Sequence, residues 1–310
     1  MTIALTFSIL SCSFAQTLLT ETPQPTATAT LSPTRTMSQT PSPSPVPFQG
    51  YGETLTDIAY CTADNSLQKM DVYFPDSGGP WPVLVYVHGG SWMRGDKSEA
   101  LMFASSMTAQ GYLVVSINYR LYPPASFPAM IEDVKCAVRS LRAHASEYNL
   151  DPNRIGAMGV SAGGHLVSLL GTSDQSKGWD VGEYLDQSSR VKAVIALAPV
   201  TDLSRNLPNT DIEIMKQMGF GADNFVQASP ISHVTSDDPP FLLIHGDRDE
   251  VVPYEQSQLM YDRLRQMNVP TQLVIVKNAT HSFSSPDGTI TPTLVEINQI
   301  ILDFLAEYLK

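Results

Sequence analysis

The sequence predicts an α/β fold in which a mostly parallel, eight-stranded sheet carries helices on both faces. Short runs of β-branched and aromatic residues, typical of strands, occur near 56–61, 69–74, 82–87, 112–117, 154–159, 191–198, 240–245 and 271–276. Helical patterns begin near residues 97, 128, 161, 253 and 290, between those runs. Strands that alternate with helices in this way usually pair in parallel and are covered on both faces.

Residues 50–310 are expected to form one large domain. A segment of about 260 residues buries enough apolar surface for a single core. Its connections are short except at 200–239, which follows the expected strand at 191–198. The apolar residues of this insertion include Ile212, Ile214, Met215, Met218, Phe220 and Phe225. We expect residues 200–239 to form a small cap, whose methionines either pack into the core or wall a pocket.

The first 49 residues differ in composition from the rest. Residues 1–16 are predicted to be a secretion signal, because their apolar run is too short to span a membrane, although no Lys or Arg precedes it. The run Ile-Leu-Ser-Cys at 9–12 resembles a bacterial lipobox. The alternatives are therefore plain secretion and a cell-surface lipoprotein with a lipid on Cys12. Residues 17–49, rich in Pro, Thr and Ser, are predicted to be a disordered linker.

A candidate nucleophile lies in the run Gly-Val-Ser-Ala-Gly at 159–163. A serine between two such glycines can sit on a sharp turn with its hydroxyl exposed, provided that a strand precedes it and a helix follows. The apolar run at 154–158 and the helical pattern at 164–170 supply that context. The sequence therefore predicts Ser161 as a nucleophile, and the alternative is an ordinary strand-to-helix turn.

A second motif, His-Gly-Gly-Ser-Trp at 88–92, follows the expected strand at 82–87. A glycine-rich loop after a strand exposes backbone N–H groups, which can stabilise the oxyanion that forms during acyl transfer. We expect the donors to be the N–H groups of Gly90, Ser91 and Ala162. His88 is expected to order the loop rather than to react.

The acid and base of a triad are expected in two later loops. Asp249 follows the strand at 240–245 and is favoured over Asp247, which is expected to cap the turn. His281 follows the strand at 271–276, whereas His245 and the remaining histidines lie in less suitable positions. The chain order Ser161, Asp249, His281 is the one found in α/β-hydrolases.

Taken together, these motifs resemble those of the α/β-hydrolase superfamily. The resemblance extends over about residues 58–309, through the runs at 69–75, 88–92, 116–121 and 127–142 and the three triad motifs. Within this superfamily the sequence resembles the small carboxylesterases, which include hormone-sensitive-lipase-like enzymes and bifunctional feruloyl/acetylxylan esterases. Ser91 replaces the third glycine of the lipase-like branch, and His-Gly-Gly-x-Trp is closer to the sugar-ester esterases. We also expect Arg120 to pair with a carboxylate such as Asp133 and brace the sheet.

The resemblance implies a serine carboxylic ester hydrolase that acts through an acyl-enzyme on short-chain or aromatic acyl esters. Acetyl or feruloyl esters of plant polysaccharide are the implied natural class. The alternatives are a lipase-like carboxylesterase and a serine peptidase of the prolyl-oligopeptidase type, although that class normally carries a large N-terminal propeller. A non-catalytic binding protein on this fold is expected to have lost a triad residue, and this chain has all three.

Composition narrows the partners further. The chain has 31 acidic and 19 basic residues and a net charge of −12, which argues against nucleic acid or an anionic membrane as a partner. No metal site, phosphate loop or dinucleotide motif is predicted, so no cofactor is expected. Cys61 and Cys136 are expected to be free thiols, and a helical wheel of 128–142 places Cys136 on the more polar side, opposite the apolar residues. A disulfide in an oxidising compartment is the alternative.

Overall fold

The computed structural model describes residues 48–310 except 64–65, 206, 209–210 and 222–223. The predicted signal at 1–16, the candidate anchor Cys12 and the linker up to residue 47 lie outside these residues. Among the helices that the structure describes, none is both long and apolar enough to cross a membrane.

Eight strands form one sheet in the order β1-β2-β4-β3-β5-β6-β7-β8. They are β1 (Thr54–Ala63), β2 (Ser66–Tyr73), β3 (Trp81–Val87), β4 (Leu113–Ile117), β5 (Leu150–Val160), β6 (Val194–Leu197), β7 (Phe241–Gly246) and β8 (Thr271–Val276). β2 runs antiparallel to both β1 and β4, and the other pairs are parallel. The predicted mostly parallel sheet is confirmed.

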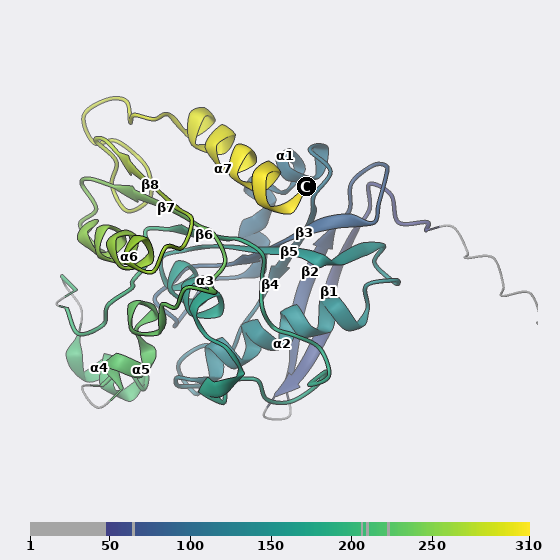
Figure 1. Cartoon of the computed structure of the whole chain (residues 1–310), viewed down its shortest axis with the longest axis horizontal. Helices are drawn as coiled ribbons and strands as arrows, with labels where there is room; N and C mark the ends of the chain where they lie inside the picture. Colours follow the sequence, from purple (N-terminus) through teal and green to yellow (C-terminus); the bar gives the residue numbers. More distant parts are fainter. Residues whose placement is uncertain (1–47, 64–65, 206, 209–210, 222–223) are drawn as a thin grey trace, which may run out of the picture. The chain divides into compact units, whose positions relative to one another are not determined.

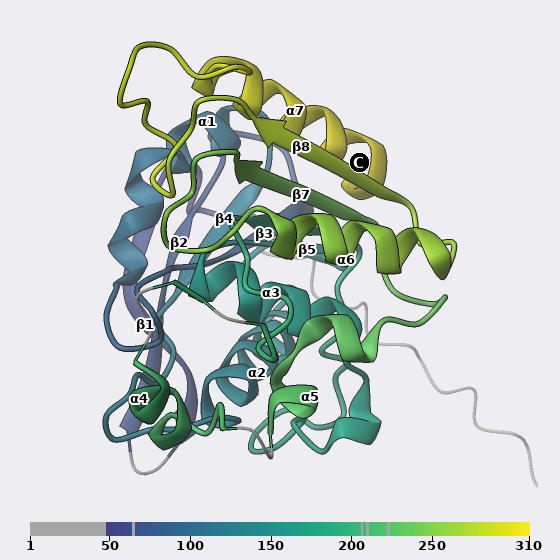
Figure 2. The ribbon, with the colours of Figure 1, turned by 90° about the vertical axis from the view of Figure 1, so that its left-hand side faces the viewer.

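The helices cover both faces of the sheet, as predicted. α1 (Ala104–Ala109) and α7 (Leu294–Leu309) lie on one face, and α2 (Ala129–Ala143), α3 (Ala162–Thr172) and α6 (Glu255–Gln266) on the other (Figures 1 and 2). The expected helix from residue 97 is a 3-10 turn, η1 (Lys97–Met102), followed by α1. Alternate residues of β3 enter different cores, Val83 and Val85 on the α2 side and Leu84 on the α7 side. This two-residue period explains why the buried strands are apolar throughout.

A salt bridge fastens the chain after β4 to α2. The Arg120 guanidinium lies 2.8 Å from the carboxylate of Asp133, which also accepts the Arg120 backbone N–H at 2.7 Å. The predicted pair of Arg120 and Asp133 is therefore confirmed.

Cys61 and Cys136 form a disulfide with their Cα atoms 6.4 Å apart, so the expectation of two free thiols was wrong. The side of α2 that carries Cys136 is polar, as the wheel indicates, but it does not face solvent. Lys135 and Arg139 on that side are buried and pair with Asp180 at 3.1 and 2.8 Å. β1 packs against the same helix and brings Cys61 to Cys136.

Candidate active site

Ser161 stands on a sharp turn between β5 and α3. Its backbone has φ 56° and ψ −117°, a conformation that costs energy in a residue with a Cβ and persists only where neighbours hold it. The Ser161 N–H donates to the Leu197 carbonyl at 2.8 Å, which fixes the turn to β6. A Cβ at Gly159 would lie 2.4 Å from the Gly163 carbonyl oxygen, so only glycine lets the chain reverse this tightly. The predicted strand, turn and helix around Ser161 are all present.

The structure brings Ser161, His281 and Asp249 into one hydrogen-bonded chain. His281 Nε2 lies 3.0 Å from Ser161 Oγ, and His281 Nδ1 lies 2.6 Å from Asp249 Oδ2. Since a carboxylate only accepts, Nδ1 carries the imidazole proton and Nε2 is free to accept the Ser161 proton. The Asp249 side chain is fully buried, whereas His281 is 20% exposed. This arrangement is suited to general-base activation of a serine.

Asp249 is held as a carboxylate by its surroundings. Burial by itself would raise its pKa, but hydrogen bonds from His245, His281 and the Val252 backbone N–H outweigh burial and bring the pKa far below its usual value. The N–H groups of Val251 and Val252 both donate to Oδ1 at 2.8 Å. At neutral pH the side chain is therefore a carboxylate, and these hydrogen bonds fix its orientation.

Asp247 lies in the same loop but serves a different purpose. Its Oδ1 accepts the backbone N–H of Asn278 at 2.6 Å, which ties the loop after β7 to the loop after β8. The structure thus places Asp249, and not Asp247, against His281.

The loop at 88–92 turns close beside the nucleophile. Gly90 has φ +106°, and a Cβ there would lie 2.1 Å from the Arg94 carbonyl oxygen, so this position requires glycine. Ser91 and Ala162 line the same cavity as Ser161, while Gly90 precedes Ser91 without forming part of the cavity wall that the described residues define. His88 is buried and stacks on Tyr119, with ring centroids 4.4 Å apart. That contact orders the loop, as expected of His88.

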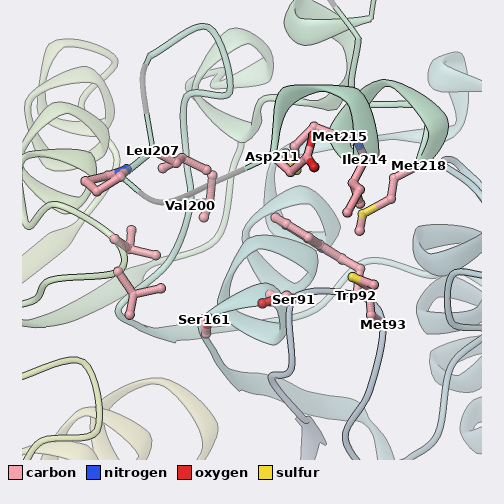
Figure 3. Close-up of a pocket in the computed structure, with 14 residues that line it drawn as sticks. Ser91, Trp92, Met93, Ser161, Val200, Leu207, Asp211, Ile214, Met215 and Met218 are labelled. Atoms are coloured by element: carbon pink, nitrogen blue, oxygen red, sulfur yellow. Dashed lines mark hydrogen bonds between the residues drawn. The ribbon is translucent and has the colours of Figure 1, made fainter.

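A cavity of about 310 Å³ opens above Ser161 (Figure 3). One wall comes from Trp92, Met93, Val251 and Val252. The opposite wall belongs to the segment 200–239, through Val200, Leu207, Pro208, Asp211, Ile214, Met215 and Met218. Four of these side chains belong to α4 (Ile212–Gln217), its N-cap and its C-cap. Met215 and Met218 are also buried, so they pack into the core and wall the pocket at once.

His165 joins the loop at 88–92 to the segment 200–239, a link that the sequence did not reveal. Trp92 Nε1–H donates to His165 Nδ1 at 3.2 Å, so the proton of a neutral ring lies on Nε2, which donates to the Ala228 carbonyl at 2.8 Å. Ala228 belongs to α5 (Phe225–Ala228). Burial lowers the pKa of His165 to about 4. The only local signal was its position on the first turn of α3, four residues after Ser161.

The buried, neutral His165 should make stability depend on pH. Because its pKa is about 4 in the folded protein and about 6.5 when unfolded, the unfolded chain binds more protons between those values. The free energy of unfolding therefore falls as the pH drops through this window. Between pH 7 and pH 5 we expect the wild type to lose about 2 kcal/mol more than His165→Gln. Urea unfolding at both pH values measures this, and equal losses would contradict it.

A metal site would need several acidic, histidine or cysteine side chains close together. In the described part of the chain, no group of three or more His, Cys, Asp and Glu side chains is placed to hold a metal ion. His245 was expected to lie in a less suitable position than His281. Its Nε2 is nevertheless 3.1 Å from Asp249 Oδ2. Its signal in the sequence was a polar residue inside an otherwise apolar buried strand, four positions before the acid.

The chain resembles known esterases in sequence. The sequence model of the BD-FAE family matches residues 70–264. The probable carboxylic ester hydrolase LipM of Mycobacterium tuberculosis is 33% identical over 246 residues, which are 75% of this chain and 56% of LipM. The chain therefore spans little more than half the length of that relative.

Solved structures resemble it as well. A truncated carbohydrate esterase from gut microbiota superposes with a TM-score of 0.72 at 27% identity, covering 83% of this chain and 96% of that one. A thermophilic esterase from the Planctomycetes species Thermogutta terrifontis, solved with butyrate bound, gives a TM-score of 0.71 at 26% identity, with 82% and 94% covered.

Proposed function

The chain belongs to the BD-FAE family of α/β-hydrolase carboxylesterases, and from that membership we propose that it is a serine esterase for short-chain or aromatic acyl esters. The observation that carries this proposal is the hydrogen-bonded chain from Ser161 through His281 to Asp249 at the base of an apolar cavity. A binding protein on the same fold would have no need to keep this chain of contacts.

The reaction begins when Ser161 Oγ attacks the ester carbonyl carbon and its proton passes to His281 Nε2. The negative oxygen of the tetrahedral intermediate accepts hydrogen bonds from the backbone N–H groups of Gly90, Ser91 and Ala162, near the positive end of the α3 dipole. Asp249 keeps the His281 tautomer and stabilises the imidazolium.

The intermediate collapses by breaking the bond to the alcohol oxygen, which takes the proton from His281 Nε2. Water then attacks the acyl-enzyme and gives a proton to the same nitrogen. Collapse of the second intermediate returns that proton to Ser161 Oγ and releases the carboxylic acid. One ester and one water are consumed, and the enzyme is restored.

Short or flat acyl groups fit the cavity best. The α4 side chains close it opposite Ser161, and each methylene forced into a well-packed pocket costs about 1 to 3 kcal/mol. Butyrate in the Thermogutta terrifontis esterase and the carbohydrate esterase from gut microbiota support this proposal. We propose acetyl or feruloyl esters of plant polysaccharide as the natural class.

Activity on p-nitrophenyl esters should peak from acetyl to butyryl and fall by about tenfold or more at decanoyl. Initial rates across the series measure this, with methyl ferulate and acetylated xylan assayed alongside to compare natural acyl groups. Rates that rise with chain length and jump at a lipid interface would contradict the short-acyl proposal and favour a lipase. Turnover of a peptide amide in place of esters would favour the peptidase alternative.

We also propose that the enzyme works outside the cytoplasm. The disulfide between Cys61 and Cys136 and the composition of residues 1–49 support this location, because disulfides persist mainly in oxidising compartments. Fractionation of producing cells, with Cys12→Ser as the variant that cannot be lipidated, tests both secretion and anchoring. Protein found only in the cytoplasm would contradict the proposal.

A further inference from the structure

A second histidine, His245, also contacts Asp249, the acid of the triad. It is the next-to-last residue of β7 and is fully buried. Its Nε2 lies 3.1 Å from Asp249 Oδ2, the same oxygen that binds His281 Nδ1 at 2.6 Å. The same Nε2 lies 2.9 Å from the Val252 carbonyl oxygen. Asp249 Oδ2 is thus shared by two imidazole rings.

The partners of His245 fix its proton. Because the Val252 carbonyl and the Asp249 carboxylate can only accept, Nε2 must carry a hydrogen and share it between them. Nδ1 lies 2.7 Å from Oγ of Ser257 on α6, whose hydroxyl is free to donate to it. A ring that carries its hydrogen on Nε2 satisfies the contacts to Asp249 and Val252, and Ser257 Oγ is the hydrogen-bond partner of the other nitrogen.

With this bond the Asp249 carboxylate has a complete set of donors. Oδ1 accepts from the Val251 and Val252 backbones, and Oδ2 from His245 and His281. Three of the four donors come from β7 and from the loop after it, so they hold the carboxylate in one orientation independently of His281. The His245 donor also draws electron density from the oxygen that faces His281, which weakens its attraction for the imidazolium.

Few other charges act on this carboxylate. Among the described residues, His245 from β7 and His281 from the loop after β8 are the titratable side chains in hydrogen-bonding contact with it. The neighbouring Arg248 pairs with Asp287 at the surface. Ser257 of α6 carries no charge, and it contacts His245 rather than Asp249 itself.

We propose that His245 is a positioning residue, which fixes the Asp249 carboxylate and thereby sets how readily His281 accepts the Ser161 proton. The inference rests on the proposed esterase function. A purely structural role is the competing explanation, because His245 also links β7 to the loop before α6 and to Ser257. The test therefore needs a readout that loss of a structural brace does not move.

Two substitutions of His245 distinguish the role of its Nε2 from that of its Nδ1. His245→Gln places an amide N–H where Nε2 was and keeps a donor toward Asp249, whereas His245→Asn reaches only the Nδ1 position and loses that donor. Ser257→Ala is the matched control, since it removes the Nδ1 partner and leaves all four donors of Asp249.

For His245→Asn we expect kcat to fall by about 10- to 100-fold with little change in KM. The acid limb of kcat/KM should move to higher pH by about half to one unit, because Asp249 then stabilises the imidazolium more strongly. His245→Gln should recover most of kcat and restore the limb. Ser257→Ala should lower the melting temperature while leaving the limb in place. An unmoved limb in His245→Asn, with a melting temperature lowered as in Ser257→Ala, would overturn the proposal.

If His245→Asn does not fold, a measurement on the wild type tests the proposal instead. In protein with ¹⁵N-labelled histidine, the Nε2 resonance of His245 should respond as His281 titrates while its proton stays on Nε2. A resonance that ignores that titration overturns the inference. This readout needs no turnover, so a wild type that hydrolyses no ester refutes the proposed function without deciding the role of His245.

Discussion

Replacing Ser161 by Ala is expected to remove ester turnover, with a fall in kcat of about six orders of magnitude. The substitution deletes the oxygen that the proposed mechanism uses to form the acyl-enzyme, while the proposed oxyanion donors and the cavity stay in place. Because Ala keeps a Cβ at the strained φ, the fold should be unchanged. Turnover of p-nitrophenyl acetate and labelling by a fluorophosphonate probe measure the loss, and the melting temperature checks the fold.

Ser91 supplies the control for this experiment. It lines the same cavity, but the proposed mechanism uses its backbone N–H and not its hydroxyl. Ser91→Ala should therefore still react with the probe. Undiminished labelling of Ser161→Ala would show that the nucleophile is another residue.

The second large effect is expected from Asp249→Asn, which should lower kcat by about four orders of magnitude. The Asn oxygen can still accept from Val251 and Val252, and its NH₂ group then faces the two histidines. His281 can meet an N–H donor only by accepting through Nδ1, which puts its proton on Nε2. That tautomer has no lone pair for the Ser161 proton.

Asp247→Asn is the matched comparison, because it makes the same chemical change two residues earlier. Its amide oxygen can still accept the Asn278 N–H, so at most about 0.5 to 2 kcal/mol of stability should be lost, with kcat changed only severalfold. Steady-state kinetics and thermal unfolding of both variants distinguish the two carboxylates. An inactive Asp247→Asn beside an active Asp249→Asn would mean that the acid has been misassigned.

The eight strands and the places of Ser161, Asp249 and His281 in the loops after them were predictable because their signals are local. A run of β-branched residues that ends in glycines or an acid predicts a strand and the loop after it, whatever the strand pairs with. The parallel order of the sheet then brings the ends of β5, β7 and β8 to one edge. Ser161, Asp249 and His281 each follow one of those strands, so their meeting required no knowledge of distant contacts.

What the sequence concealed depends on contacts between distant segments. The disulfide was missed because its two cysteines are 75 residues apart, and no local pattern shows that β1 packs against α2. His165 looked like an ordinary helix residue, since Trp92 and Ala228 reach it from segments 73 and 63 residues away. His245 sits four residues from Asp249, yet its role depends on Ser257 and on the fold of the loop between them.

The segment 200–239 connects β6 to β7, which are adjacent strands of the sheet. β6 and β7 pair in register from Val194 with Phe241 to Leu197 with Ile244, so the sheet closes beneath the insertion whatever its length. The reacting side chains are carried by other loops, whereas α4 supplies the wall opposite Ser161. Much of the wall that faces the acyl group is thus encoded apart from the residues of the triad. Exchanging this insertion for that of a relative is therefore expected to change which acyl groups fit, while Ser161, Asp249 and His281 stay on their own loops.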